Sequence, residues 1–113
     1  MRIVIDTSSL IYLIEKRIDP SILAEHTIFV TYPVLDELQT LSIKRRKARV
    51  ALKLLRVMAP FVAGGAGPAD RSVVAAAEMM GGAVLSGDDE VVEEARRRGL
   101  AVLLFHDKEL VSL

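Results

Sequence analysis

The sequence predicts an α/β fold: a three-layer α/β/α sandwich with a short central parallel sheet, formed by a single domain over residues 1–113. Two observations support this prediction. Short, almost wholly apolar runs alternate with amphipathic helical segments, and strands of that kind are typical of parallel sheets covered on both faces. The chain is also long enough to bury one hydrophobic core and too short for two.

Composition narrows the class of protein. Hydrophobic residues make up 51% of the chain, which excludes a disordered polypeptide. The longest uncharged stretch is too short and too broken to cross a membrane, and the N-terminus lacks the apolar run of a secretory signal. There is no cysteine, so a disulfide framework and thiolate metal sites are excluded. We therefore expect a cytoplasmic protein without a membrane partner.

The first forty residues predict two strands and three helical segments. Residues 2–5 and 27–30 are short apolar runs rich in β-branched side chains, as in buried strands. The hydroxyl residues Thr7–Ser9 precede an apolar cluster at helical spacing, which is the usual signature of a helix start. A further helical turn is expected near Pro20, and a helix is expected across residues 34–41.

The clearest helix is expected over Lys44–Met58, where cations surround two adjacent apolar stripes. One stripe consists of Val50, Leu54 and Val57, and the other of Ala51, Leu55 and Met58. Beyond this helix the pattern predicts a loop at 63–68, followed by a helix from Pro68 to about Met80. A strand is expected at 83–85. The last two elements expected are a helix through Val91 and Ala95 that ends at Gly99, and a strand at 100–105.

Four acidic residues follow or face the carboxyl ends of these strands. Asp6 follows the first strand and Asp88 the strand at 83–85, and ligands of such sheets bind at this edge. Glu37 lies near the core-facing stripe of its helix, and Asp70 lies in the first turn of the next. Four converging carboxylates would need a hard cation such as Mg²⁺, which could orient a water and stabilise charge on a phosphate. The set therefore predicts phosphodiester hydrolysis.

Each of these acids also has a structural explanation when it is taken alone. Asp6 and Asp88 are good helix N-caps, and Asp70 is favoured by the dipole of its helix. Glu37 fits a solvated helix position. Only their convergence would distinguish a metal site from four ordinary surface and capping residues.

A basic stretch stands out although the net charge is zero. Between Leu38 and Ala69 there are seven cations and no acid, and such asymmetry is a hint about partners. We expect either a solvated helix face or contacts with RNA phosphates, which would add salt dependence to binding. The candidates for RNA contact are Lys44, Arg45, Arg46 and Arg49.

Four segments of the chain resemble the motifs of PIN-domain ribonucleases, in the same order and with similar spacing. They are Ile3–Ile11, Pro33–Leu38, Asp70–Ala77 and Ser86–Asp88. The resemblance spans residues 1 to about 105 and is closest to the branch shared by archaeal ribosomal-RNA-processing nucleases and VapC-type toxins. It implies a Mg²⁺- or Mn²⁺-dependent endoribonuclease that is often a homodimer, with an antitoxin protein as partner if it is a toxin.

The same resemblance implies that Asp6, Glu37, Asp70 and Asp88 are the catalytic metal ligands, and that Asp36 is not one. Ser8, Ser86 and Asp89 are then candidates for an outer shell around the ligands. The sequence departs from the family pattern at Arg71, where relatives often have a second acid, and at Ser86–Gly87, which replaces Thr-Asn. Exposed apolar residues near Tyr12 or at 110–113 are candidates for a dimer seam.

Other classes of α/β protein fit less well. A phospho-receiver domain needs an acidic pair near its first strand and a late lysine, and a haloacid-dehalogenase-like phosphatase needs Asp-x-Asp, whereas the chain has Asp6-Thr7-Ser8. A phosphate-binding loop of the Gly-x-x-x-x-Gly-Lys-Ser/Thr type is absent. The remaining alternative is a non-catalytic PIN-like module that binds RNA or a protein partner.

Overall fold

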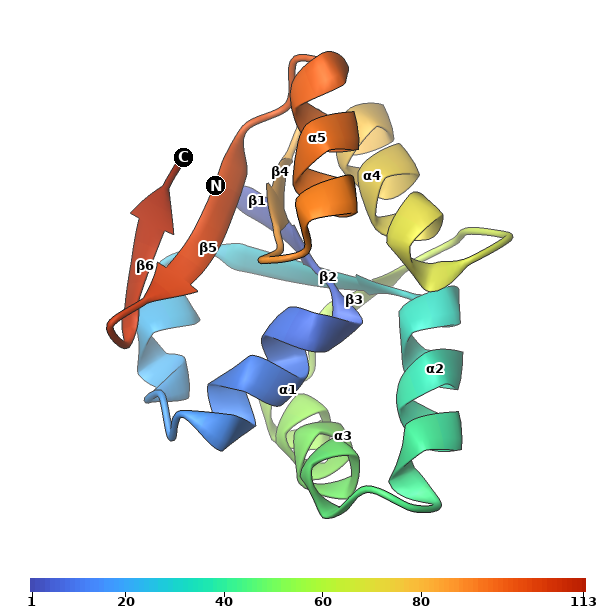
Figure 1. Cartoon of the computed structure of the whole chain (residues 1–113), viewed down its shortest axis with the longest axis vertical. Coiled ribbons are helices and arrows are strands. Elements are labelled where there is room, and N and C mark those ends of the chain that lie inside the picture. The colour runs from blue at the N-terminus through green and yellow to red at the C-terminus, as the bar shows by residue number, and fades with distance from the viewer.

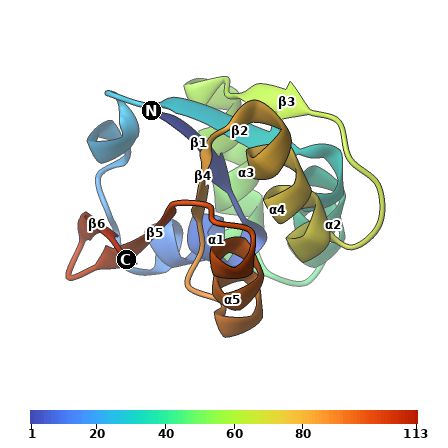
Figure 2. The ribbon, with the colours of Figure 1, turned by 90° about the horizontal axis from the view of Figure 1, so that it is seen from above.

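Short apolar strands form the centre of the molecule (Figure 1). The computed structural model describes residues 1–113 and has six strands: β1 (Arg2–Ile5), β2 (Thr27–Thr31), β3 (Phe61–Ala63), β4 (Ala83–Leu85), β5 (Val102–His106) and β6 (Glu109–Ser112). They form one sheet in the order β3-β2-β1-β4-β5-β6, and only β6 is antiparallel to its neighbour. Figure 2 shows β3 and β6 on opposite sides of the molecule, as the two edges of this sheet. The predicted α/β class with a mostly parallel sheet is confirmed.

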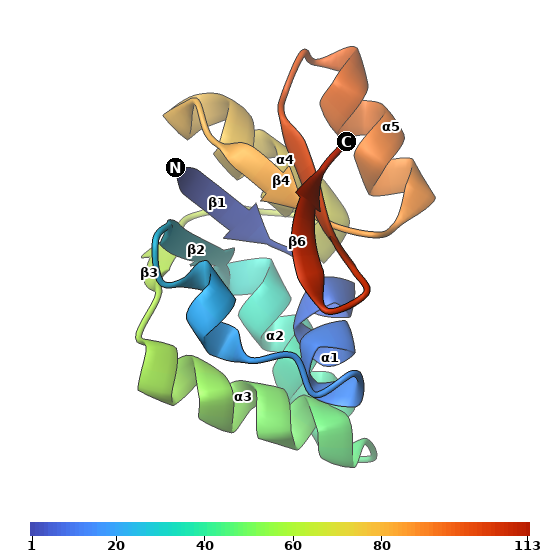
Figure 3. The same cartoon turned by 90° about the vertical axis from the view of Figure 1, so that its left-hand side faces the viewer.

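Helices connect the strands and cover both faces of the sheet. They are α1 (Thr7–Glu15), α2 (Tyr32–Ser42), α3 (Arg46–Met58), α4 (Ala69–Met80) and α5 (Asp89–Arg97), with a 3₁₀ turn, η1, at Pro20–Leu23. Helix α1 packs on α3, and α4 packs on α5. Figure 3 shows these two pairs on opposite sides of the central strands. Connections between parallel strands are right-handed, so helices that connect strands toward opposite edges of the sheet lie on opposite faces. None of the helices combines the length and the apolar character needed to cross a bilayer.

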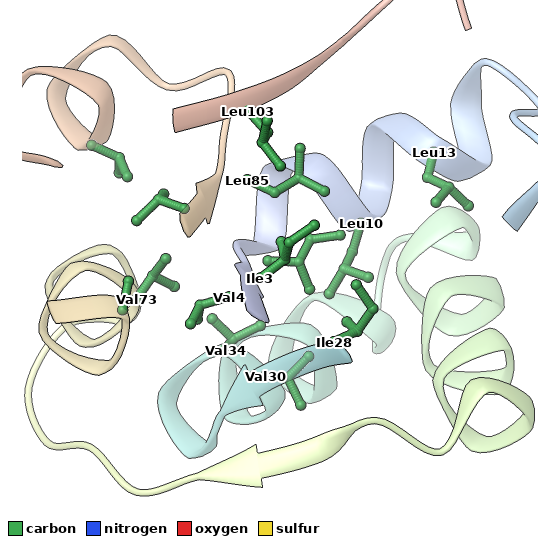
Figure 4. Close-up of a cluster of buried hydrophobic side chains, with 14 of the residues drawn as sticks. Ile3, Val4, Leu10, Leu13, Ile28, Val30, Val34, Val73, Leu85 and Leu103 are labelled. Atoms are coloured by element: carbon green, nitrogen blue, oxygen red, sulfur yellow. The ribbon is translucent and has the colours of Figure 1, made fainter. Parts of the chain in front are cut away.

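The core lies on both sides of β1, one of the central strands of the sheet. Its residues Ile3, Val4 and Ile5 are wholly buried, and successive side chains of a strand point to opposite faces. Figure 4 shows Ile3 directed toward Leu10 of α1 and Val4 toward Val73 of α4. Because both faces are covered, the three buried residues of the strand are all apolar rather than alternating with polar ones.

Two of the strands lie outside the sequence prediction. Strand β3 is only three residues long, and its last residue, Ala63, is the first residue of the expected loop at 63–68, so the loop begins one residue later than predicted. Strand β6 forms a hairpin with β5 through Asp107 and Lys108, which both have positive φ angles of 49° and 63°. Tight hairpin turns of this geometry usually have asparagine, aspartate or glycine followed by glycine. Asp107 fits the first position, but Lys108 stands where glycine is usual, so the sequence signal for the turn is incomplete. Leu110 and Val111, candidates for a dimer seam, pair with β5 and are half-buried.

Helix α3 buries only one of its two predicted apolar stripes. Ala51 and Leu55 are buried, together with Ala48. By contrast, Val57 is 83% exposed and Val50 is 36% exposed. Leu54 of the same stripe is half-buried against the core, so the exposed apolar side chains of this helix are those of Val50 and Val57.

Candidate functional site

The order of the strands reverses between β1 and β4. After β1 the chain moves to β2 and then β3, and it returns to the opposite side of β1 to form β4. In open α/β sheets, ligands bind in the crevice outside the carboxyl ends of the strands at this kind of reversal. Figure 1 shows the first turns of α1, α2, α4 and α5 gathered at this edge of the sheet. The fold therefore points to the carboxyl ends of β1 and β4 as the functional edge.

Asp6 directly follows β1 at this edge and is 5% exposed. Its carboxylate accepts hydrogen bonds from the backbone N–H of Ser9 at 2.8 Å, from the Ser8 hydroxyl at 3.1 Å and from the buried hydroxyl of Ser86. The Ser9 bond caps α1, so the local structural explanation for Asp6 holds as well. The capping role and a role in a metal site are compatible, because a carboxylate has more lone pairs than one cap requires.

The Asp6 carboxylate is buried without a positive charge beside it. Burial raises the pKa of Asp6 above its usual value. Hydrogen bonds from Ser86, Ser9 and Ser8 offset only part of this rise. Asp6 takes part in no salt bridge. A buried carboxylate in this state is stabilised either by a proton or by a cation. Its oxygen donors and its uncompensated charge fit a hard divalent cation.

Ser86 joins the two sides of the strand reversal. It directly follows β4, is wholly buried, and donates its hydroxyl proton to Asp6. The same hydroxyl accepts a hydrogen bond from the backbone N–H of Asp88 at 3.1 Å. Asp88 in turn caps α5, because its carboxylate accepts from the backbone of Glu90 and Val91 at 2.9 and 3.2 Å. Ser86 thus links two of the four predicted site residues, Asp6 and Asp88.

Asp70 and Glu37 lie on the two helices next to this centre. Asp70 is exposed in the first turn of α4 and lines a cleft of about 580 Å³ between α4 and α5, which also includes Glu90. Glu37 is exposed on α2. The first turns of these two helices are joined by a buried hydrogen bond of 2.7 Å between the hydroxyls of Thr31 and Ser72. Asp70 and Glu37 therefore lie on two helices whose N-terminal ends contact each other.

The structure brings only some of the predicted residues into contact. Ser8 and Ser86 contact Asp6 directly, and Asp88 is connected to it through Ser86. No three acidic or histidine side chains lie close enough together in this structure to hold a metal ion. Asp89 is an exposed residue in the first turn of α5. The ligand set of Asp6, Glu37, Asp70 and Asp88 thus stays a prediction.

Some residues of this edge carry no clear signal in the sequence. The Thr31–Ser72 pair is one case, because isolated hydroxyl residues are common at helix starts. Glu90 resembles any other acid in the first turn of a helix. Thr7 follows Asp6 in the chain, and its hydroxyl is buried without a hydrogen-bond partner. The sequence of Thr7–Ser9 predicts a helix start but does not predict this buried hydroxyl.

The predicted RNA-binding cations lie at the opposite end of α2. This helix has 11 residues, which corresponds to about 16 Å along its axis. Lys44, Arg45 and Arg46 are exposed where α2 leads into α3. Arg49 is also exposed, and its guanidinium donates to the carbonyl of Ser42 at 2.8 Å. Any ligand that reaches both Asp6 and these cations must extend along α2.

Comparison with solved structures shows the fold plainly. The PIN domain endonuclease Utp24 superimposes with a TM-score of 0.83 at 17% identity, over 98% of this chain and 90% of that one. VapBC2 from Rickettsia felis, bound to a DNA fragment from its promoter, gives a TM-score of 0.69 at 18% identity, over 94% and 100%. A PilT N-terminus domain protein from Sulfolobus solfataricus gives 0.63 at 13% identity, over 92% and 87%.

Comparison at the level of sequence gives no such match. No protein-family model and no curated protein matches this chain. The similarity to solved structures therefore concerns the backbone, and it confirms the predicted PIN-like fold.

Proposed function

We propose that this chain, which has the PIN-domain fold, is a Mg²⁺- or Mn²⁺-dependent endoribonuclease that hydrolyses RNA phosphodiester bonds. The main support is the buried carboxylate of Asp6, which lies where the strand order reverses. Ser86 donates a hydrogen bond to this carboxylate from the end of the neighbouring strand, and no cationic side chain neutralises its charge. A carboxylate kept in that state is suited to a cation. Its position matches the edge where such sheets bind ligands.

In this proposal Asp6 is the central ligand, and Glu37, Asp70 and Asp88 complete the set. Glu37 and Asp70 are exposed, and exposed side chains change rotamer within nanoseconds, so they are free to turn toward an ion. A bound Mg²⁺ or Mn²⁺ would supply a water of lowered pKa and stabilise charge on the phosphate. Ser86 and Ser8 orient the Asp6 carboxylate through their hydroxyls, and Asp89 is a candidate for an outer position.

The remainder of the edge favours a phosphate. The first turns of α1, α2, α4 and α5 meet there (Figure 1), and the N-terminal end of a helix carries unpaired N–H groups and a partial positive charge that favour anions. The exposed cations at the far end of α2 would then contact phosphates farther along an RNA strand. This arrangement suits an extended single strand better than a mononucleotide.

Two biological settings fit the proposed activity. The fold is shared with the endonuclease Utp24, in line with an RNA-processing role, and with VapBC2, in line with a toxin controlled by an antitoxin protein. We also propose a homodimer, because Tyr12 and the edge strand β6 leave half-buried apolar side chains at the surface. A non-catalytic module that binds RNA or a protein is the alternative function, favoured by the separation of the acidic side chains.

The test is cleavage of a labelled single-stranded RNA with Mn²⁺ and with EDTA, for the parent protein and for Asp6→Asn. We expect cleavage only with Mn²⁺, and a loss of at least about a hundredfold in the variant, because even residues that support a ligand commonly contribute about 10–100-fold. Asparagine keeps the cap of α1, so the fold should persist in circular dichroism.

A second readout of the same proteins is independent of activity. Mn²⁺ should raise the melting temperature of the parent and should raise that of Asp6→Asn much less, because an ion that binds only the folded state stabilises it. Equal cleavage by parent and variant would contradict the nuclease proposal. Tight RNA binding without any cleavage would favour the non-catalytic alternative instead.

A further inference from the structure

A pair of aromatic rings lies beside the candidate site. Tyr12 of α1 and Phe105 of β5 have nearly parallel rings, with 7° between their planes and 6.3 Å between their centres. Figure 3 shows the end of the β5–β6 hairpin next to α1. The last residue of β4, Leu85, pairs with Leu103, so Phe105 lies beyond the carboxyl end of β4. The aromatic pair is therefore at the same edge of the sheet as Asp6.

The two rings line a pocket of about 340 Å³ that adjoins Asp6. Its lining contains no charged side chain and consists of Ser8, Ser9, Tyr12, Gly87, Leu104 and Phe105. Ser8 through its hydroxyl and Ser9 through its backbone N–H donate to the carboxylate of Asp6. On the other wall, Gly87 immediately precedes Asp88, and a Cβ built on this glycine would meet no atom within 4 Å. The pocket is thus open beside Gly87 and bordered by residues of the candidate site.

One face of α1 continues from this pocket to a cation. Ser8, Tyr12 and Lys16 are spaced four residues apart, so they share a face of the helix in steps of about 6 Å. The ammonium of Lys16 lies 5.8 Å from the centre of the Tyr12 ring. Lys16 is exposed and takes part in no salt bridge. The row therefore leads from the Asp6 carboxylate, past an aromatic ring, to a cation without an acidic partner.

We infer that this pocket binds the base of the nucleotide next to the scissile phosphate, with Tyr12 stacking on the base and Lys16 contacting the next phosphate. The inference rests on the proposed function, because the Asp6 site fixes where the scissile phosphate lies. Aromatic side chains commonly hold unpaired bases by stacking, with little dependence on sequence. An uncharged pocket with hydroxyl groups on one wall suits a neutral ring that has polar edges.

Two other occupants fit this pocket less well. Tyr12 is also a candidate for the dimer seam, but one ring cannot pack on a second copy and on a base at the same time. The inference therefore leaves the seam to β6. An apolar side chain of another protein would fill the pocket, but it would bring neither a polar partner to Ser8 nor an anion to Lys16.

The experiment compares two short RNA oligonucleotides that have the same number of phosphates. One consists only of abasic ribose units, and the other carries a single base in the middle. Binding to the parent is measured in EDTA, where no cleavage is expected. The single base should increase affinity by about tenfold, as expected for one base stacked on an aromatic ring. A fluorescent adenine analogue at that position should be quenched on binding.

Matched variants assign this gain in affinity to the pocket. Tyr12→Leu should abolish the gain, whereas Tyr12→Phe keeps the ring and should retain it. Phe61→Leu makes the same kind of change at an aromatic residue that is 64% exposed, on β3 and outside the pocket, and should also retain the gain. Lys16→Ala should weaken both oligonucleotides equally and make the salt slope shallower by about 0.7, the value for one phosphate of a single strand.

A second variant covers the case in which Tyr12→Leu does not fold, which circular dichroism would reveal. Gly87→Val places methyl groups where the structure leaves space, and it should abolish the gain by filling the pocket. Cleavage of the single-base oligonucleotide with Mn²⁺ provides the position. The parent should cut next to the base, and Tyr12→Leu should cut at many positions along the backbone.

Three outcomes would overturn the inference. The parent could bind both oligonucleotides equally, which would leave the pocket to a side chain of another protein. The gain could persist in Tyr12→Leu or in Gly87→Val. The chain could form a dimer in ultracentrifugation that Tyr12→Leu dissociates, which would assign the ring to a second copy.

The same data separate this inference from the nuclease proposal. A gain in affinity that depends on Tyr12, without any cleavage in Mn²⁺, would contradict the nuclease and support a base-binding pocket. Cleavage that depends on Mn²⁺ but ignores the position of the base would contradict the pocket and leave the nuclease proposal intact.

Discussion

Ser86 donates a hydrogen bond to the carboxylate of Asp6 across 80 residues of sequence, between the ends of two adjacent parallel strands. Both residues are buried. Their contact lies where the strand order of the sheet reverses. The bond therefore ties the candidate site to the topology of the fold, and its removal gives a direct test of how the site is maintained.

Replacing this donor should destabilise the protein at neutral pH. In Ser86→Ala the Asp6 carboxylate has one hydrogen bond fewer, and bonds to charged groups are commonly worth about 1.5–3 kcal/mol. Because the bond also lowers the pKa of Asp6, that pKa should rise further in the variant. Urea denaturation and an NMR titration of the Asp6 carboxyl would measure both effects. Ser86→Thr keeps the hydroxyl and is the control; an unchanged titration in Ser86→Ala would contradict the prediction.

The raised pKa of Asp6 predicts how stability without metal depends on pH. Burial favours the protonated carboxyl in the folded state. Its contribution to stability is therefore fully present below the pKa of an unfolded aspartate and is lost as the pH rises through the higher folded pKa. Asp6→Asn should remove this dependence and should be the more stable protein at neutral pH, by on the order of 1 kcal/mol.

Chemical denaturation of parent and Asp6→Asn in EDTA, across the acidic range and up to neutral pH, would check this. The two curves should converge at low pH, where the aspartate is protonated. A variant that is less stable than the parent at neutral pH would show that the Asp6 charge is well stabilised by its hydrogen bonds alone.

The hydroxyl pair Thr31–Ser72 should couple α2 to α4. Thr31 also caps α2 through the backbone N–H of Val34, and Ser72 donates to the carbonyl of Ala69. Gly65 packs over the pair, since a Cβ built there would lie 3.2 Å from that of Ser72. We expect Thr31→Val and Ser72→Ala each to lower the free energy of unfolding by about 1–2 kcal/mol.

The two substitutions should also be non-additive, because they share one bond. A double-mutant cycle in urea would measure that coupling. If the effects simply add, the two helices are held together by their apolar contacts and not by this hydrogen bond.

The basic connection between α2 and α3 gives a prediction about salt. Replacement of Arg45, Arg46 and Arg49 by alanine should weaken binding of single-stranded RNA and flatten its dependence on salt. The slope of log K against log salt should become shallower by about 0.7 for each phosphate that the variant no longer binds. Arg96→Ala on α5 provides a matched control for a surface cation. An unchanged slope would mean that these arginines form an ordinary solvated helix face.

Much of the fold is predictable because periodicity and helix starts are local signals. The apolar run before Asp6 indicates a strand. The hydroxyl residues that begin at Thr7, and the proline at position 68, each indicate the start of a helix. The β5–β6 hairpin is not predictable in this way, because Asp107 and Lys108 adopt positive φ angles without the glycine that usually reveals them. In α3, periodicity offers two stripes, and only the packing of α1 and α2 against the helix decides that Ala51 rather than Val50 is buried.

The site is only partly predictable for a related reason. The motif of Ser86 places it near the aspartates, but its hydrogen bond to Asp6 depends on the pairing of β1 with β4. Likewise, the contact of Thr31 with Ser72 requires α2 and α4 to meet. Contacts between distant segments leave no periodic trace in the sequence, whereas a cap or an amphipathic helix does.

The pairing of β1 with β4 has a consequence for biosynthesis. The two strands are separated in the chain by α1, β2, α2, α3, β3 and α4, so they can pair only after all of those segments are available. Long-range parallel pairing of this kind is intrinsically slow to form. A nascent polypeptide that ends before Ser86 contains Asp6 but lacks the hydroxyl that donates to its carboxylate from the end of β4. The polar edge of the sheet can therefore be completed only when most of the chain has been made.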